Sequence, residues 1–311
     1  MAEWLYEEGI GENRAALVER GEIVEAAIEL DDQDLRVGAV LAARFAGAGR
    51  LVLEGGGEAV LDLVPPGFTQ GASLLVEIVR EPIEERGRHK PAKAIPAPNG
   101  ATPRPGPTLL ERLGAGPWPV RRLRPHQPDL LEQAGWSEII EEAAGGEIAF
   151  LGGSLRVAVT PAMTLIDVDG PPPLRPLAVA AAAAAASAIV RHGIGGSIGI
   201  DFPTLADRAA RQQVAGAVDS VLPQPFERTA VNGFGFLQIV RRRARASLPE
   251  LIQADPTGAR ARAALRLAER VPPGDSAPHI VDGQVLRRLQ SRPDWLGALD
   301  RRRGAPVRFA E

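Results

Sequence analysis

The sequence contains no cysteine, one tyrosine and two methionines, and aromatic residues make up 4% of its 311 positions. Without cysteine, disulfide bonds, thiolate zinc sites and cysteine nucleophiles are excluded, so a metal ion must be held by oxygen or histidine ligands. No apolar run reaches the roughly 18 residues of a membrane span, and the first eight residues are acidic where a signal peptide would be basic. We therefore expect a cytoplasmic protein with no membrane partner.

The chain is long enough, and at 45% apolar residues hydrophobic enough, to form more than one core. Its net charge of −3 argues against a uniformly basic nucleic-acid binder, although arginine is clustered late in the sequence. Five regions are predicted: an N-terminal β segment with a hairpin over 12–30 (1–34), a small barrel or sandwich (35–86), a Pro/Gly/Arg-rich linker without regular structure (87–128), an α/β domain (129–252) and a small C-terminal domain (253–311).

The α/β region begins with a predicted helix from Asp129 to Ala144 and continues as a βαβ pattern. Two strands are expected to pair, an alanine-rich segment is a strong helix former, and a buried strand and a second helix follow. The ranges are 154–159 and 163–168 for the paired strands, 177–191 for the first helix, 197–201 for the next strand and 205–221 for the second helix.

Two of these strands end in aspartate. Asp167 and Asp169 are two residues apart, so they share one face of a regular strand, and Asp201 ends the next strand. Ligands collect at the carboxyl ends of strands in open α/β sheets, which would bring the three carboxylates together. Such a cluster repels itself unless a cation binds, and carboxylates of this kind hold Mg²⁺ or Mn²⁺ for phosphodiester hydrolysis. In the alternative interpretation, Asp167 and Asp169 cap a loop and Asp201 is the N-cap of the following helix.

The surroundings of the aspartates resemble a known family. The segments Gly152–Val157 and Met163–Gly170, then Ile194–Phe202 after the alanine-rich helix, and Phe234–Arg243, resemble in order the motifs of the catalytic core of the ribonuclease E/G family. The resemblance implies a multidomain α+β and α/β fold. In it, an S1-like (OB-type) β-barrel is inserted in a reduced RNase H-like portion, and a DNase I-like α/β catalytic domain follows.

The resemblance also implies roles. Asp167 and Asp201 match the two metal-binding aspartates of the family, and Asp169 matches a neighbouring position that is often asparagine. The implied activity is endonucleolytic hydrolysis of single-stranded RNA in RNA processing, with Mg²⁺, or Mn²⁺ as the alternative ion, and water as the nucleophile. The alternative is a non-catalytic RNA-binding protein on the same scaffold, but the three acidic positions favour the enzyme.

Three departures from the family pattern matter. The Pro-rich stretch occupies the place of the family's 5′-monophosphate sensor, so we expect cleavage to be independent of the 5′ end. The zinc-binding cysteine pair is replaced near Asp255–Gly258, so no zinc is expected and a homo-oligomer would not be zinc-linked. Gly233 stands where a basic residue usually precedes the Phe-Gly motif.

The candidate RNA contacts are aromatic and basic. Phe234, Arg241, Arg242 and Arg243 lie in the segment that resembles the RNA-facing one, while Phe45, Lys90 and Lys93 lie in or after the barrel. Each has a structural alternative: a solvated face for the arginines, the barrel core for Phe45 and a mobile charged linker for the lysines. His192 follows the alanine-rich helix, where it is expected to act as a C-terminal cap.

Overall fold

The computed structural model describes residues 1–64, 66–85, 88–272 and 277–311, and it divides into two compact units. Unit 1 contains Met1–Asp34, Leu109–Glu138 and Ile252–Glu311, and unit 2 contains Leu35–Thr108 and Ile139–Leu251. The chain therefore leaves and re-enters unit 1 twice, and each excursion contributes to unit 2. The protein is mixed α/β and contains a closed five-stranded β-barrel.

Unit 1 has a four-stranded sheet of order β11-β1-β2-β3. Its strands are β1 (Glu3–Glu8), β2 (Glu12–Glu19), β3 (Glu22–Leu30) and β11 (Val120–Arg122). The predicted hairpin is confirmed, because β2 and β3 are antiparallel and their tight turn places both Arg20 and Gly21 at positive φ, 55° and 87°. One face of the sheet packs Trp4, Tyr6 and Leu17 against the short helix α1 (Leu109–Gly114).

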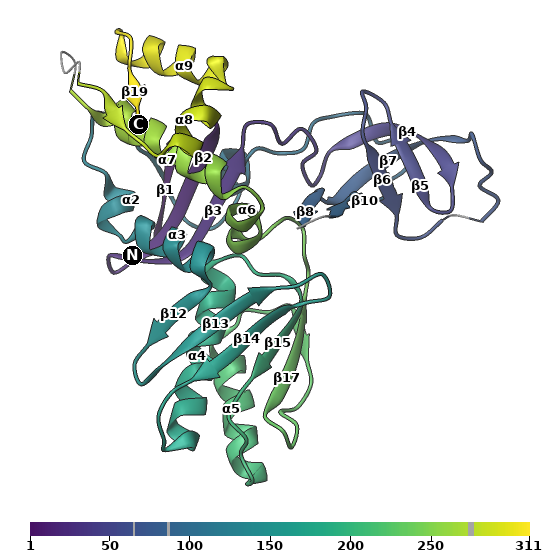
Figure 1. Cartoon of the computed structure of the whole chain (residues 1–311). Coiled ribbons are helices and arrows are strands. Elements are labelled where there is room, and N and C mark those ends of the chain that lie inside the picture. Colours follow the sequence, from purple (N-terminus) through teal and green to yellow (C-terminus); the bar gives the residue numbers. More distant parts are fainter. Residues whose placement is uncertain (65, 86–87, 273–276) are drawn as a thin grey trace. The chain divides into compact units, whose positions relative to one another are not determined.

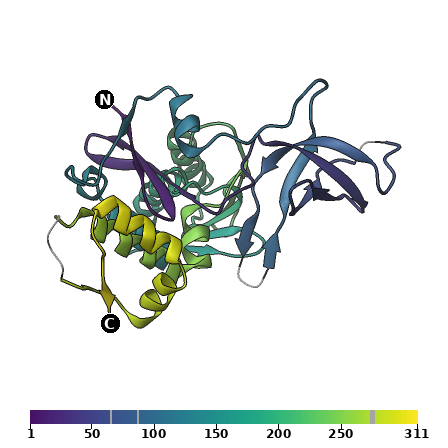
Figure 2. The same ribbon diagram turned by 90° about the horizontal axis from the view of Figure 1, so that it is seen from above.

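The C-terminal part of unit 1 is helical. Its elements are α6 (Leu248–Ala254), which begins in unit 2, α7 (Pro256–Arg270), α8 (Gly283–Gln290), α9 (Pro293–Arg303) and the paired strands β18 (His279–Ile280) and β19 (Phe309–Ala310). Asp255 and Asp282 cap α7 and α8 by accepting backbone N–H groups of the first turn. The helices α7, α8 and α9 pack on one another around Leu265, Leu289 and Trp295 (Figure 2).

The barrel in unit 2 has the closed order β10-β6-β5-β4-β7. Its strands are β4 (Val40–Gly47), β5 (Arg50–Leu53), β6 (Glu58–Leu61), β7 (Ser73–Arg80) and β10 (Ala92–Pro96). Side chains such as Leu51, Val76 and Ile78 alternate into a dry interior. A closed five-stranded barrel of this size is compatible with the OB type.

The structure of the barrel corrects the prediction that residues 87–128 form a linker without regular structure. Residues 87–128 include β9 (Arg88–Lys90), which pairs with β8 (Ile83–Glu85), the closing barrel strand β10, α1 and β11. The barrel therefore ends at Pro96 rather than near residue 86. Proline was expected to prevent regular structure, but it excludes only interior ladder positions, and Pro91 and Pro96 fall before the first and at the last residue of β10.

The helix expected over Asp129–Ala144 is broken. It forms α2 (Leu130–Gln133) and α3 (Trp136–Gly145), which are separated at Gly135, a residue with φ of +96°. Asp129 begins α2 by accepting the N–H of Glu132 at 3.1 Å. The apolar spacing continues across the break, which explains why the pattern predicts a single helix.

The second part of unit 2 is a six-stranded sheet of order β12-β13-β14-β15-β17-β16. Its strands are β12 (Glu147–Phe150), β13 (Gly153–Val159), β14 (Thr164–Asp169), β15 (Gly196–Asp201), β16 (Phe226–Arg228) and β17 (Phe236–Arg241). The predicted pairing of β13 with β14 is confirmed, and β14 and β15 are parallel across the crossover helix α4 (Leu174–Arg191).

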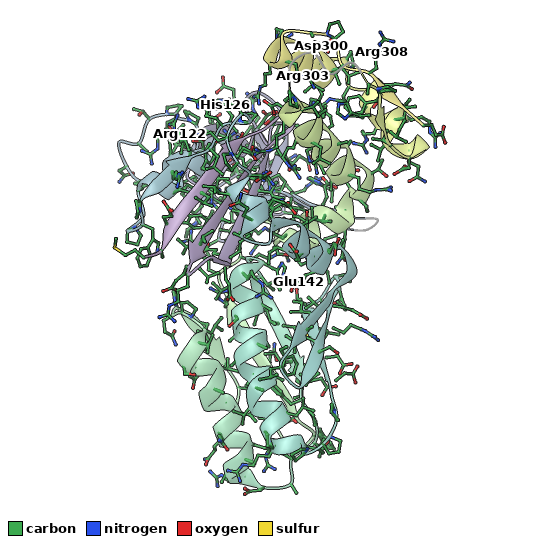
Figure 3. The ribbon with its side chains drawn as sticks, turned by 90° about the vertical axis from the view of Figure 1, so that its left-hand side faces the viewer. Arg122, His126, Glu142, Asp300, Arg303 and Arg308 are labelled. Atoms are coloured by element: carbon green, nitrogen blue, oxygen red, sulfur yellow. The ribbon has the colours of Figure 1, made fainter. Side chains whose placement is uncertain are left out.

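Helices cover one face of this sheet and leave the other open. α4 and α5 (Arg208–Val221) pack side by side on the covered face (Figures 1 and 3). The alanines of α4 make this close packing possible, because Ala178, Ala181 and Ala185 are completely buried in the core. Among the described helices, α4 alone is long and apolar enough to cross a membrane, but its packing in this core is consistent with a protein that has no membrane partner.

Candidate functional site

The open face of the six-stranded sheet carries the predicted aspartates. Along β14, Thr164, Ile166 and Val168 are buried against the helices, so Asp167 and Asp169 point to the opposite, exposed face. Asp201 is exposed as the last residue of β15. Both strands run in the same direction, so their carboxyl ends meet at one edge of the sheet.

The pairing register of the parallel strands β14 and β15 brings two of the three carboxylates together. Asp167 is the direct partner of Asp201 in the parallel ladder, and adjacent strands are about 4.8 Å apart. The interpretation of Asp201 as the N-cap of the following helix is wrong, since Asp207 caps α5. Asp167 lies inside β14, and Asp169 is its last residue before the loop. Asp169 lies one step further along the same face, opposite Ser154.

The carboxylate pair fits an open metal site rather than a closed cage. Within the described residues, no group of three or more aspartate, glutamate or histidine side chains is arranged to enclose a metal ion. Mg²⁺ commonly binds through one or two carboxylates and keeps several waters. Asp167 and Asp201 offer such a pair, and their exposure leaves room for waters and for a phosphate.

The pair stands in a row of side chains that crosses the open face of the sheet. Arg156 is the β13 partner of Asp167, and Phe236 is the β17 partner of Asp201. Arg156 also forms an ion pair with Glu147 on β12 at 3.2 Å. The motifs alone did not single out Arg156 or Phe236. The predicted strand bounds, 154–159 paired with 163–168, would have placed Arg156 opposite Ile166, one residue away from its partner Asp167.

Phe236 forms an apolar surface next to the carboxylates. Its ring lies over Gly199, since a Cβ on this glycine would be 2.5 Å from Cζ of Phe236 and 3.0 Å from Cδ2 of Leu165. A side chain at position 199 would therefore displace both groups. The absence of a side chain at Gly199 leaves room for the Phe236 ring on the open face beside Asp201.

Phe234 projects from a rigid turn at the same edge. The side-chain oxygen of Asn232 accepts the N–H groups of Phe234 and Phe236, at 2.9 and 3.0 Å. Gly235 has φ of +97°, and a Cβ there would be 2.1 Å from the carbonyl oxygen of Phe202. The turn is thus held on both sides, yet the Phe234 side chain is 84% exposed. An exposed ring on a fixed backbone is suited to stack on a nucleobase.

The basic run lies at the other end of β17. Phe236 begins this strand opposite Asp201, whereas Arg241 ends it opposite Gly196, about 17 Å along a strand of this length. Arg241 donates to the carbonyl of Ile194 at 3.2 Å, and Arg243 pairs with Glu250. Arg242 is exposed and, in the described part of the chain, has no bonded partner.

The barrel candidates are occupied by internal contacts. Phe45 is 6% exposed and meets Phe68 edge to face, with ring centroids 6.3 Å apart, as expected for the core alternative. Lys90 pairs with Glu85, and Lys93 is 2.5 Å from Asp62. These ion pairs hold the lysines near the closing strand β10.

His192 is a buried structural residue. Its backbone N–H bonds to Ala188 at the C-terminal end of α4, which confirms the predicted position of the cap. The side chain is fully buried, with Nε2 3.0 Å from Glu142, and Arg191 donates to the same carboxylate oxygen at 3.0 Å. His192 therefore joins α3 to α4, on the covered side of the sheet.

The chain matches no protein-family model and no curated protein.

Proposed function

We propose that the protein is a divalent-metal-dependent endoribonuclease that hydrolyses phosphodiester bonds of single-stranded RNA at the open face of the six-stranded sheet. The observation that carries the proposal is the parallel register of Asp167 with Asp201 at the carboxyl ends of β14 and β15. Two exposed carboxylates in direct register repel each other, and a bound cation would relieve that repulsion. The resemblance to the ribonuclease E/G family supports the choice of RNA as the substrate.

Under this proposal, the residues at the site have three roles. Asp167 and Asp201 would hold the ion, and Asp169, two residues further along β14, would orient water at the site. When bound, Mg²⁺ or Mn²⁺ neutralises charge on the phosphate and activates the attacking water. Phe234 stacks on a base, and this contact fixes the phosphate over the carboxylate pair.

We also assign the domains on this basis. The closed barrel corresponds to the S1-like domain, the sheet of unit 1 to a reduced RNase H-like portion, and the six-stranded sheet with α4 and α5 to the DNase I-like catalytic domain. The barrel would bind RNA through its outer surface, where Arg44 and Arg50 are exposed. The proposal includes RNA processing as the biological role and the cytoplasm as the location.

Incubation of the purified protein with labelled single-stranded RNA, with and without Mg²⁺ or Mn²⁺, tests the proposal. Discrete internal cuts that require the ion would support it. Binding without cleavage under any divalent ion would instead identify a non-catalytic RNA-binding protein, and cleavage of single-stranded DNA alone would show that the substrate is DNA.

The 5′ end of the RNA is expected to have no influence on cleavage. Only residues 97–108 lie between the last barrel strand β10 and α1, too few for a separate sensor domain. One RNA sequence carrying a 5′-triphosphate, hydroxyl or monophosphate should therefore be cut at equal rates. A strong preference for the monophosphate form would contradict this prediction.

Phe234→Ala is expected to weaken binding of single-stranded RNA by about 1–3 kcal/mol, or roughly 5–150-fold, because a stacking contact is lost. Phe234→Trp should preserve binding. Since the side chain is exposed, neither variant should change the melting temperature. Leu267→Ala is the matched control, because Leu267 is 68% exposed on α7 in unit 1. Equal effects of Phe234→Ala and Leu267→Ala would refute the stacking role.

A further inference from the structure

An open groove of about 510 Å³ lies between α5 and the connection from β16 to β17. Its floor is made of small residues, since Ala215 and Gly216 line it from α5 and Ala230 lines it from the connection. A Cβ at Gly216 would meet no atom within 4 Å, so the floor is free of neighbouring side chains. The volume lies in the range of grooves that hold small organic groups.

The groove has an excess of positive charge. Arg208, Arg211 and Arg228 line it together with a single carboxylate, Asp219. Arg228 is paired with Asp219 through two hydrogen bonds, one of them 2.6 Å long. The other two arginines are not balanced by an acid among the residues that the structure describes. Two positive charges therefore remain for an external anion.

Two of the arginines are already held in place. Arg211 donates to the carbonyl groups of Leu205 and Ala206, at 2.6 and 3.0 Å, and these neutral partners leave its charge available. The bidentate contact with Asp219 fixes Arg228, and it lowers the pKa of the Asp219 carboxyl. Fixed guanidinium groups lose little entropy when a phosphate binds.

The first turn of α5 does not itself provide the anion site. The side chain of Asp207 accepts the N–H groups of Ala209 and Ala210, at 3.0 and 3.2 Å. These donors are therefore occupied by the cap, and its negative charge opposes an anion at the helix terminus. Arg208, which is exposed and has no bonded partner in the described chain, extends from the first residue of the same helix.

Short segments of the chain connect the groove to the strands that carry the carboxylate pair. β15 ends at Asp201 and α5 begins at Arg208, so this helix starts at the edge that carries the carboxylates. The connection that lines the groove at Ala230 and Val231 continues into the Phe234 turn, and then into Phe236, the register partner of Asp201. The Phe234 turn thus separates the groove from the carboxylates.

We propose that this groove binds the phosphate backbone of single-stranded RNA, on the stretch of strand that extends past Phe234 from the carboxylate pair. Two unbalanced arginines match two consecutive phosphates, each with one negative charge. The small floor accepts sugars without selecting bases, which suits binding that is independent of sequence. The path of the strand rests on the proposed endoribonuclease site, but the groove's affinity for RNA does not require cleavage.

Binding of oligouridylates in the presence of a chelator tests the groove without cleavage. The strands are lengthened one nucleotide at a time, and affinity is measured by fluorescence anisotropy over a salt series. For strands long enough to reach the groove, Arg208→Gln should reduce the slope of log affinity against log salt by about 0.7. Arg208→Lys should retain the wild-type slope, and Arg208→Glu should weaken binding further. Arg301→Gln, which removes an exposed helical arginine of α9 in unit 1, is the matched control.

The outcomes separate the two proposals. If the Arg208→Gln protein binds strands of every length with the same affinity and salt dependence as the Arg301→Gln control, the proposed RNA-binding role of the groove is wrong. This conclusion holds even if the wild type cleaves RNA. In a second outcome, the wild type cuts no RNA with any divalent ion, while Arg208→Gln still lowers the salt dependence of RNA binding. That result would contradict the proposed endoribonuclease activity and support RNA binding in the groove. A wild-type protein that binds no single-stranded RNA would overturn the groove as well.

Discussion

Asp167→Asn and Asp201→Asn are each expected to lower the rate of RNA cleavage by about 10²–10³-fold, because losing one ligand of the ion removes several kcal/mol of charge stabilisation. RNA binding measured with a chelator should change little, since Phe234 and the groove arginines remain. The carboxylates are exposed on the open face, so the variants should keep the wild-type melting temperature. Cleavage of labelled RNA over a Mg²⁺ series measures the effect.

Two matched variants control this prediction. Glu147→Gln removes an exposed acid at the far end of the same row of side chains, where it pairs with Arg156, and it should cleave as the wild type does. Asp169→Asn should lose less activity than either member of the pair, since Asp169 is offset along β14 from Asp201. If Asp167→Asn and Glu147→Gln cleaved equally well, the carboxylate pair would not be the catalytic site.

Arg14→Met is expected to lower the free energy of unfolding of unit 1 by about 3 kcal/mol, because it breaks a buried network of charges. Arg14 is 2% exposed, donates to Glu7 at 2.5 Å and to Asp129 at 3.0 Å, and lies 5.2 Å from the ring centroid of Trp136. Arg270 contacts the same two carboxylates. After the substitution, Arg270 alone would have to balance both acids. Urea unfolding measures the loss.

Arg156→Met is the matched control for stability. Its ion pair with Glu147 is exposed on both sides, so its loss should cost less than about 1 kcal/mol. Equal destabilisation by Arg14→Met and Arg156→Met would contradict a stabilising role for the buried network.

The same network predicts that the stabilisation provided by Arg14 decreases in acid. Burial by itself would raise the pKa of Asp129, but Arg14, the N–H of Glu132 and Arg270 together lower it below the usual value of 3.8. A lowered pKa in the folded state stabilises the protein above pH 3.8, and this contribution is lost as the pH falls through the folded pKa. The difference in stability between the wild type and Arg14→Met should therefore shrink in acid, as urea unfolding at decreasing pH would show.

Local patterns were sufficient for several elements. Arg20-Gly21 between two alternating segments predicted the β2–β3 hairpin, because both turn residues must adopt positive φ. The alanine-rich segment predicted α4 through helix propensity, and the apolar run before Asp201 predicted a buried strand. These features depend on residues that are close in sequence, so no knowledge of distant contacts was needed.

Other features depend on contacts between distant segments. The sequence leaves Phe45 open as a residue that stacks on RNA or as a core residue. Closure of the barrel packs Phe68 against it, so Phe45 belongs to the core. The basic residues from Arg241 follow Phe234 closely in sequence, yet an extended strand carries them to the opposite end of the sheet. The prolines of the expected linker proved compatible with β10 because they stand at its ends.

The sequence by itself determined the kind of chemistry this protein can offer. Without cysteine, any metal ion must be held by oxygen or histidine ligands, and the alternation along β14 and β15 sends Asp167, Asp169 and Asp201 to one face. Tertiary structure alone decided which of these carboxylates are partners, because the register of β14 with β15 joins residues that are more than 30 positions apart in the sequence. That register joins Asp167 to Asp201, and the β15–β17 pairing brings Phe236 and the Phe234 turn to the same edge.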